Sequence, residues 1–178
     1  MTTFSLKPHP DTPPLGISSI EVDCWYAGGR WCFRYLVEGV ARLSLPDSEE
    51  PLRADGLWQT TCFEALVGGD GAAYREYNFS ASGEWAAYVF DGPRQGMRNA
   101  DEKIEVWLEG GNDWIAIEAA VTAGLAPGSP LNLTAVIEEK GGIKSYWALA
   151  HPAKELDAPP DFHNRDCFVA HLPSGKAP

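Results

Sequence analysis

Turn-forming residues interrupt this chain at short intervals along almost its whole length. The turns fall at Gly28-Gly29, Asp47-Ser48, Gly68-Gly69-Asp70-Gly71, Ser82-Gly83, Asp91-Gly92-Pro93, Gly110-Gly111-Asn112, Pro127-Gly128 and Gly141-Gly142. The stretches between them are rich in Val, Ile, Thr, Trp, Tyr and Phe, which favour pleated strands. No stretch sustains a 3.6-residue hydrophobic period. The pattern therefore predicts an all-β chain of many short strands, folded as a sandwich or barrel.

The candidate strands cover most of the chain and define one domain. They run over 17–25, 30–38, 40–45, 57–67, 74–80, 84–90, 104–109, 113–121, 131–138, 143–150 and 166–172. With 178 residues, of which 44% are hydrophobic and 22% charged, the chain can bury one proper core. We predict a mostly antiparallel β-sandwich over 17–172, immunoglobulin-like or jelly-roll-like, with an extended segment at 1–16 and a tail at 173–178.

The acidic composition restricts the partners. The formal net charge is −11, which repels phosphate backbones and anionic lipid, so we expect neither nucleic acid nor a membrane surface as a partner. A neutral polyol such as a sugar is unaffected by that field. No apolar run approaches the roughly 18 residues of a membrane span, and Met1–Gly16 has no apolar signal-peptide core, which predicts a cytoplasmic protein. Nothing in the sequence sets an oligomeric state.

The four cysteines form no C-x-x-C pair. In a reducing compartment such residues are typically small core side chains, and a zinc site would need closer ligand spacing. We therefore predict core thiols and no metal site.

Two neighbouring runs, 57–67 and 74–80, predict a hairpin with its turn near Asp70. Side chains alternate between the two faces of a strand, and this register sets Glu64 opposite Glu76. A slip of two residues would leave both carboxylates on the same face. Facing carboxylates destabilise a sheet by up to about 1 kcal/mol. An arginine, a metal ion, a shared proton or a ligand hydroxyl should offset that cost.

The same face predicts a groove. The next strand sets Ala86 opposite Asn78 and Tyr88 opposite Glu76, so Ala86 and Asn78 form a floor between the walls Trp58 and Tyr88. Aromatic walls with a few polar groups are typical of small-ligand pockets. Aromatic faces suit the C–H faces of a pyranose, and Glu and Asn can hydrogen-bond its hydroxyls.

A structural interpretation of these residues stays open. The aromatic residues of this segment can equally be core or sheet-surface residues. In that interpretation Glu64 and Glu76 belong to a solvated face and pair with Arg75, Arg94 or Arg165.

The C-terminal third adds two candidate constellations. In 143–150 and just after it, Trp147 and His151 share a face, so Trp147 is either a second stacking platform or a core residue. The cluster Asp161–Phe168 is dense in polar groups and enters the last strand, where it either builds a site or caps the sandwich edge.

No motif supports catalysis. The chain lacks G-x-S-x-G, a phosphate loop and G-x-G-x-x-G, and Cys167 near His163 sits on no nucleophile elbow. Glu64 and Glu76 resemble a glycosidase pair, which acts at separations of about 5–5.5 or 6.5–9.5 Å, but nothing else favours hydrolysis. We predict a protein that is not an enzyme.

Long motifs carry a family resemblance. Asp55–Glu64, Tyr74–Tyr88, Tyr146–Pro152 and Phe162–Phe168 resemble the bacterial DOMON-like family, over about residues 6–172. That family is similar to family-nine carbohydrate-binding modules and to haem-binding DOMON domains. The resemblance implies a β-sandwich of about ten strands.

The resemblance to the carbohydrate-binding modules also implies site residues. Their pattern matches Trp58, Glu64, Asn78 and Gly83, with Trp147, or alternatively Trp85, as the second stacking tryptophan. Calcium occurs in those modules, but no residue here matches its ligands.

The haem-binding branch implies a Met–His ligand pair. Here that pair is Met97 with His151 or His163, although Met97 lies in a Gly- and Arg-containing loop rather than in an apolar strand. We therefore predict no cofactor.

The sequence thus predicts a non-catalytic module that binds a carbohydrate or a sugar-like small molecule. The predicted ligand-binding residues are Trp58, Glu64, Glu76, Asn78, Tyr88, Arg94, Trp147, His151 and Arg165. A b-type haem electron-transfer domain is one alternative. The other alternative is a protein-interaction sandwich without a small ligand, which predicts that there is no pocket at Trp58.

Overall fold

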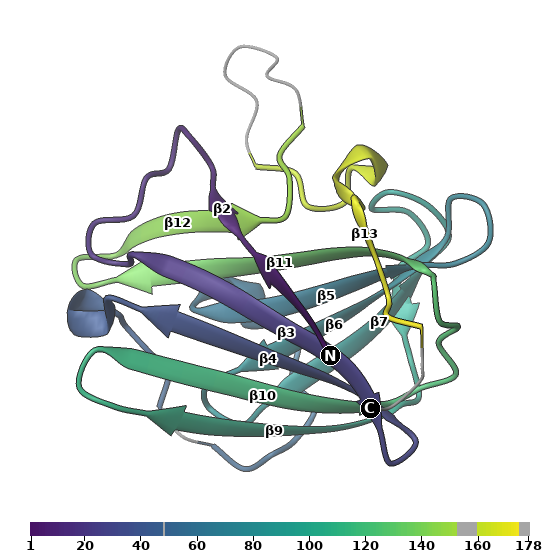
Figure 1. The fold of residues 1–178 in the computed structure, drawn as a ribbon, viewed down its shortest axis with the longest axis horizontal. Coiled ribbons are helices and arrows are strands. Elements are labelled where there is room, and N and C mark those ends of the chain that lie inside the picture. The colour runs from purple at the N-terminus through teal and green to yellow at the C-terminus, as the bar shows by residue number, and fades with distance from the viewer. Residues whose placement is uncertain (48, 153–159, 175–178) are drawn as a thin grey trace.

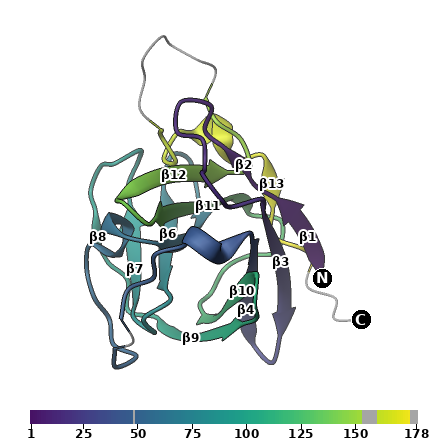
Figure 2. The ribbon, with the colours of Figure 1, turned by 90° about the vertical axis from the view of Figure 1, so that its left-hand side faces the viewer.

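In a computed structural model, which describes residues 1–47, 49–152 and 160–174, the chain forms two antiparallel β-sheets packed against each other (Figure 1). The smaller sheet has the strand order β1-β3-β4-β10-β9. The larger has the order β2-β12-β11-β5-β6-β7-β8, with β13 pairing β11. Figure 2 shows the two layers from the side. The predicted all-β sandwich is confirmed, with 13 strands among the described residues.

The strands of the smaller sheet are β1 (Thr2–Ser5), β3 (Ser19–Ala27), β4 (Arg30–Glu38), β9 (Lys103–Gly110) and β10 (Trp114–Thr122). Those of the larger sheet are β2 (Lys7–Pro8), β5 (Cys62–Gly68), β6 (Tyr74–Ser80), β7 (Trp85–Phe90), β8 (Arg98–Asn99), β11 (Pro130–Glu139), β12 (Ile143–Ala148) and β13 (Ala170–His171).

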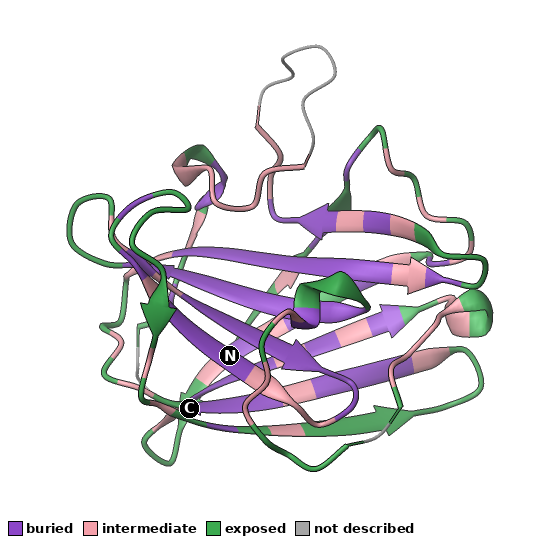
Figure 3. Ribbon diagram, turned by 180° about the vertical axis from the view of Figure 1, so that it is seen from behind, coloured by how far each residue is buried: buried purple, intermediate pink, exposed green. Residues whose placement is uncertain are grey.

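The main core lies between the sheets. Tyr35 of β4 packs on Phe63 of β5 with ring centroids 5.2 Å apart, and Phe33 stacks on Phe79 at 6.0 Å. The Tyr35 hydroxyl also donates a 2.6 Å hydrogen bond to the carbonyl oxygen of Glu64. Aromatic pairs of this kind contribute beyond the area that they bury. Figure 3 shows the buried central strands and the largely exposed edge strand β9. All four cysteines are buried free thiols, as predicted.

The larger sheet is buried on its outer face as well. Every residue of β5 is buried, so loops must cover the face that points away from the main core. A second apolar cluster forms there, made of Leu57, Cys62, Leu66, Tyr74, Ala86, Tyr88, Phe90 and Phe168. This doubly buried sheet explains why the sequence of β5 is apolar on both faces apart from Glu64.

The first 16 residues belong to both sheets. We expected an extended segment outside the domain, but β1 pairs with β3 and β2 pairs with β12. The connecting Leu6 is buried in the core. The segment is held further by the fully buried Glu139, whose carboxylate accepts hydrogen bonds from the backbone N–H groups of Leu15 and Gly16 at 2.6 and 2.7 Å.

Three predicted strand segments contain 3₁₀ turns instead. These are Val40–Arg42, Leu57–Gln59 and Arg165–Cys167. Gly39 and Gly56 precede the first two with φ of 81° and 77°, a left-handed conformation that redirects the chain and favours glycine.

No described helix is long and apolar enough to cross a membrane. Residues 175–178 of the predicted tail lie outside the described residues.

Candidate functional site

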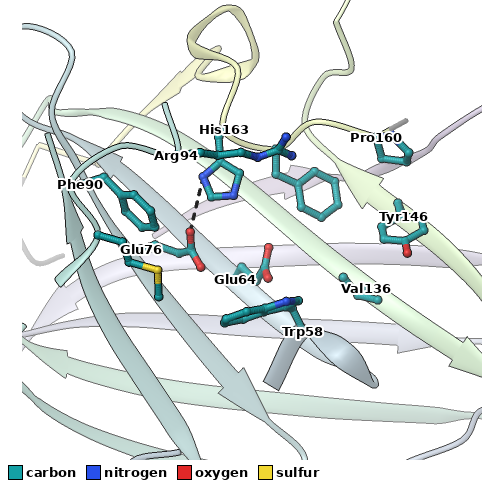
Figure 4. A pocket seen from close by; sticks show the side chains of 11 residues that line it. Trp58, Glu64, Glu76, Phe90, Arg94, Val136, Tyr146, Pro160 and His163 are labelled. Carbon is teal, nitrogen blue, oxygen red and sulfur yellow. Dashed lines mark ion pairs between the residues drawn. The ribbon is translucent and has the colours of Figure 1, made fainter. Parts of the chain in front are cut away.

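A pocket of about 370 Å³ opens on the outer face of the larger sheet (Figure 4). Its floor comes from the sheet, and its walls come from the turn Leu57–Gln59, the loop after β7 and the segment 160–163. The lining residues are Trp58, Glu64, Glu76, Phe90, Arg94, Met97, Val136, Tyr146, Pro160, Phe162 and His163. The mixture of aromatic walls and a few polar groups is typical of small-molecule sites, which measure about 300–1,000 Å³.

Two buried carboxylates form the polar part of the floor. Glu64 is 5% exposed and accepts a 2.7 Å hydrogen bond from the Thr134 hydroxyl through Oε2. Glu76 is 6% exposed and accepts a 2.8 Å hydrogen bond from the Asn78 amide through Oε1. Thr134 and Asn78 are themselves fully buried. Each carboxylate is therefore fixed by a neutral donor at one oxygen only.

The strand register differs by two residues from the predicted one. Glu64 pairs with Asn78, and Leu66 pairs with Glu76. The ladder runs to Gly68 and Tyr74, and a tight turn closed by the 2.9 Å bond from Gly69 N–H to the Ala73 carbonyl sets this register. A shift of two residues preserves the faces, so both carboxylates still point into one pocket. The predicted pairing of β7, with Tyr88 opposite Glu76 and Ala86 opposite Asn78, is confirmed.

Burial raises the pKa of both carboxyl groups. For Glu64, desolvation is the largest cause and the nearby charge of Glu76 raises the pKa further, whereas the hydrogen bond from Thr134 lowers it. For Glu76, desolvation also dominates, and Asn78 and Arg94 act in the opposite direction. Raised pKa values mean that the pair holds a proton more readily than exposed glutamates do.

Arg94 lines the pocket, but its guanidinium is ion-paired with an acid other than Glu64 or Glu76. Its guanidinium forms a 3.0 Å ion pair with Asp161, and its backbone, with φ of 56°, donates a 3.3 Å hydrogen bond to the Tyr74 hydroxyl. A non-glycine residue at positive φ is uncommon and marks a constrained loop. Arg94 therefore joins the loop after β7 to the segment that contains His163, rather than pairing directly with either glutamate.

His163 covers the pocket from the C-terminal segment. Its Nδ1 lies 2.6 Å from the Tyr74 hydroxyl and 3.7 Å from Glu76 Oε2, the contact dashed in Figure 4. Because the Tyr74 hydroxyl accepts the Arg94 N–H, we assign it as donor to Nδ1, which places the imidazole proton on Nε2. Burial, then the charge of Arg94, lowers the pKa of His163 to about 4, so the ring is neutral at physiological pH.

This neutral histidine predicts a loss of stability in acid. The pKa of His163 is about 4 in the folded chain against an ordinary 6.5, so between these pH values the unfolded chain binds the extra proton. Its contribution to stability is complete above pH 6.5 and declines as the pH falls toward 4. We expect His163→Phe to reduce the slope of unfolding free energy against pH in this window, measured by urea denaturation. An unchanged slope would contradict the assignment of a neutral ring.

The aromatic wall combines an exposed tryptophan with buried support. Trp58 is 40% exposed and contacts the fully buried Tyr88 edge to face, with centroids 6.2 Å apart. The Tyr88 hydroxyl donates a 2.6 Å hydrogen bond to Asp55, which also pairs with Arg53. Tyr88 thus supports Trp58 from below instead of lining the pocket.

Of the nine predicted site residues, the structure brings four to the pocket lining: Trp58, Glu64, Glu76 and Arg94. Trp58 arrives from the 3₁₀ turn rather than from β5. Asn78 and Tyr88 lie directly behind the lining, where they hold Glu76 and Trp58.

The other three predicted residues lie elsewhere. Trp147 is 3% exposed and packs in the core between the sheets, with its Nε1 donating to Ser145 at 3.0 Å. Its neighbour Tyr146 faces the pocket instead, because adjacent residues of a strand point to opposite faces. His151 binds the Lys7 carbonyl at 2.8 Å near the N-terminal segment. Arg165 stacks on Phe168 with its guanidinium carbon 4.4 Å from the ring centroid.

Sequence reasoning missed most of the wall. Phe90, Val136, Tyr146, Pro160 and Phe162 line the pocket although no spacing rule joins them. His163 had two signals: its place in the polar cluster Asp161–Phe168, and its place as an alternative haem ligand beside Met97.

The pocket fits haem poorly. Met97 and His163 both line it, as the Met–His interpretation requires. However, Met97 is half exposed, and two buried carboxylates occupy the floor where a porphyrin face would need apolar side chains. Among the described residues, no group of three or more His, Cys, Asp or Glu side chains is arranged to hold a metal ion.

The fold and the site together define a β-sandwich with a small-molecule-sized pocket on one sheet. No family model matches the chain, and no curated protein matches it. A solved structure from Bacteroides uniformis, named a "putative carbohydrate-binding protein", shares the fold with a TM-score of 0.60 and 12% sequence identity. The likeness covers 91% of this chain and 83% of that one.

Proposed function

We propose that the pocket binds a carbohydrate or a sugar-like small molecule without chemical change. The observation that carries the proposal is the arrangement of the lining: aromatic side chains form the wall, and two carboxylates, fixed by Thr134 and Asn78, form the polar floor. Fixed polar groups cost little reorganisation on binding and set the orientation of a ligand.

The aromatic wall suits the faces of a sugar ring. Trp58 is exposed enough to be contacted and is held in place by Tyr88. A rigid aromatic side chain contributes large contact area at low entropic cost. The free carboxylate oxygens of Glu64 and Glu76 can accept hydrogen bonds from ring hydroxyls. The pocket volume of about 370 Å³ is at the lower end for such sites and favours a small ligand over a long polymer.

Two likenesses support the proposal. The motifs Asp55–Glu64 and Tyr74–Tyr88 resemble DOMON-like domains, which are similar to family-nine carbohydrate-binding modules. The fold neighbour from Bacteroides uniformis carries a carbohydrate-binding name. The interaction-domain alternative predicts that there is no pocket at Trp58, whereas Trp58 lines one.

Calorimetric titration with mono- and disaccharides tests the proposal. We expect Trp58→Ala to weaken binding of the best ligand by about tenfold or more, since truncating a tryptophan anchor in a binding site commonly costs about 2 kcal/mol or more. Trp107→Ala is the matched control, because Trp107 is 46% exposed on β9 of the other sheet and should leave binding unchanged.

Two results would reject the proposal. One is the absence of binding by every sugar tested. The other is binding that survives Trp58→Ala and Glu64→Ala. Chromatography of the ligand after long incubation should recover it unaltered, and hydrolysed product would overturn the non-catalytic part.

A further inference from the structure

The floor of the pocket has more negative charge than the surrounding side chains compensate. Thr134 and Asn78 bind Glu64 Oε2 and Glu76 Oε1, and both donors are neutral. Among the described residues, no Lys or Arg forms an ion pair with Glu64 or Glu76. The second oxygen of Glu64 accepts no hydrogen bond from those residues, although the side chain is more than nine-tenths buried and points into the pocket (Figure 4).

Neither nearby basic group cancels the charge of the pair, although the charge of Arg94 lowers the pKa of Glu76. Arg94 is ion-paired with Asp161 at 3.0 Å. His163 lies 3.7 Å from Glu76 Oε2, but its imidazole is neutral and its Nδ1 accepts a hydrogen bond from the Tyr74 hydroxyl. Two buried carboxylates in one pocket require either a proton or a cation, because an uncompensated buried charge is strongly unfavourable.

The rest of the pocket suits a cation as well as a sugar ring. Trp58, Phe90 and Tyr146 line it, and the faces of aromatic rings attract a positive charge within about 6 Å of their centroids. The chain as a whole carries a net charge of −11, which draws cationic ligands toward the protein and repels anionic ones.

We propose that the ligand is an amino sugar, whose protonated amine binds between Glu64 and Glu76 while its ring lies against Trp58. This inference rests on the proposed function and narrows it to one class of sugar. Burial raises the pKa of Glu64 to about 8, so the carboxylate pair of the unliganded protein holds a proton at neutral pH. The incoming ammonium replaces that proton, which passes to the buffer, so that the net charge of the pocket is the same before and after binding.

Three matched disaccharides test the inference. They are the β-1,4-linked dimers of glucosamine, N-acetylglucosamine and glucose, titrated below the pKa of the sugar amine. We expect the glucosamine dimer to bind about tenfold more tightly than the neutral dimers, since hydrogen bonds between charged partners exceed neutral ones by this order. Calorimetry in two buffers of different ionisation enthalpy should show proton release with the glucosamine dimer only.

Variants locate the preference. Glu64→Gln and Glu76→Gln keep the side-chain shape and should bring the ratio of amino to neutral affinity toward one. Glu109→Gln, which removes an exposed charge from β9, should keep the ratio. The wild-type comparison and the proton release need no variant, so they stand even if a substitution prevents folding.

Each result has one meaning. Equal binding of all three dimers would overturn the amino-sugar inference and leave the proposed function intact. Binding of none would overturn both. A preference for the glucosamine dimer that persists in both glutamine variants would overturn the assignment of its amine to Glu64 and Glu76.

Discussion

Replacing Trp147 with alanine should lower the free energy of unfolding by about 3–5 kcal/mol, the usual cost of emptying a buried tryptophan site. Trp147 is 3% exposed and contributes to the core between the sheets. In the sheet, Trp147 of β12 pairs with Pro8 of β2. Its removal leaves a cavity and loosens the N-terminal segment. For a chain of this size the melting temperature should fall by roughly 6–20 °C.

Two other tryptophan variants serve as controls for Trp147→Ala. Trp107→Ala, at an exposed position of β9, should change stability by about 0.5 kcal/mol or less. Trp58→Ala should impair ligand binding far more than folding. If Trp147→Ala left the melting temperature unchanged and abolished sugar binding, Trp147 would be a stacking platform and its placement in the core would be refuted.

Replacing Asn78 with aspartate should destabilise the protein by about 3–5 kcal/mol near neutral pH, comparable to leaving a buried charge without its partner. Asn78 is fully buried, donates to Glu76 at 2.8 Å and accepts a 3.5 Å bond from the Cys62 thiol. The substitution keeps the shape but exchanges the donor for a third acid next to Glu64 and Glu76.

The pH dependence of stability distinguishes an effect of the introduced charge from an effect of side-chain packing. Burial and the neighbouring glutamates hold the folded-state pKa of the introduced carboxyl group above its unfolded value of about 3.9. The folded chain then binds more protons, so the penalty is absent below that value and grows as the pH rises through the folded-state pKa. Denaturation at several pH values, with the exposed Asn112→Asp as control, measures this. A penalty independent of pH would point to packing instead.

Alternation of side chains was enough to predict the floor of the site. Glu64, Glu76 and Asn78 share a face at any register that differs by two residues, so the error in pairing did no harm. The turn chemistry could not fix the register, because Gly68 to Ala73 offers several ways to close the hairpin. The start of β5 was also predicted too early, since Gly56 turns the chain into a 3₁₀ turn that strand propensity does not reveal.

The wall of the site depends on tertiary structure. Tyr146 and Trp147 are adjacent aromatic residues, and their order along β12 does not say which faces the core. Phe162 and His163 reach the pocket from nearly 100 residues away in sequence from Glu64, through bonds such as that from the Asn132 amide to the Phe162 carbonyl at 3.1 Å. Contacts between segments so far apart leave no periodic pattern in the sequence from which they could be predicted.

A crystal structure of the protein with its best-binding sugar tests most directly whether this pocket is the binding site. We predict a sugar ring against the indole of Trp58, with at least one polar group of the ligand within hydrogen-bonding distance of Glu64 or Glu76. A sugar bound at another surface, with this pocket left empty, would contradict it.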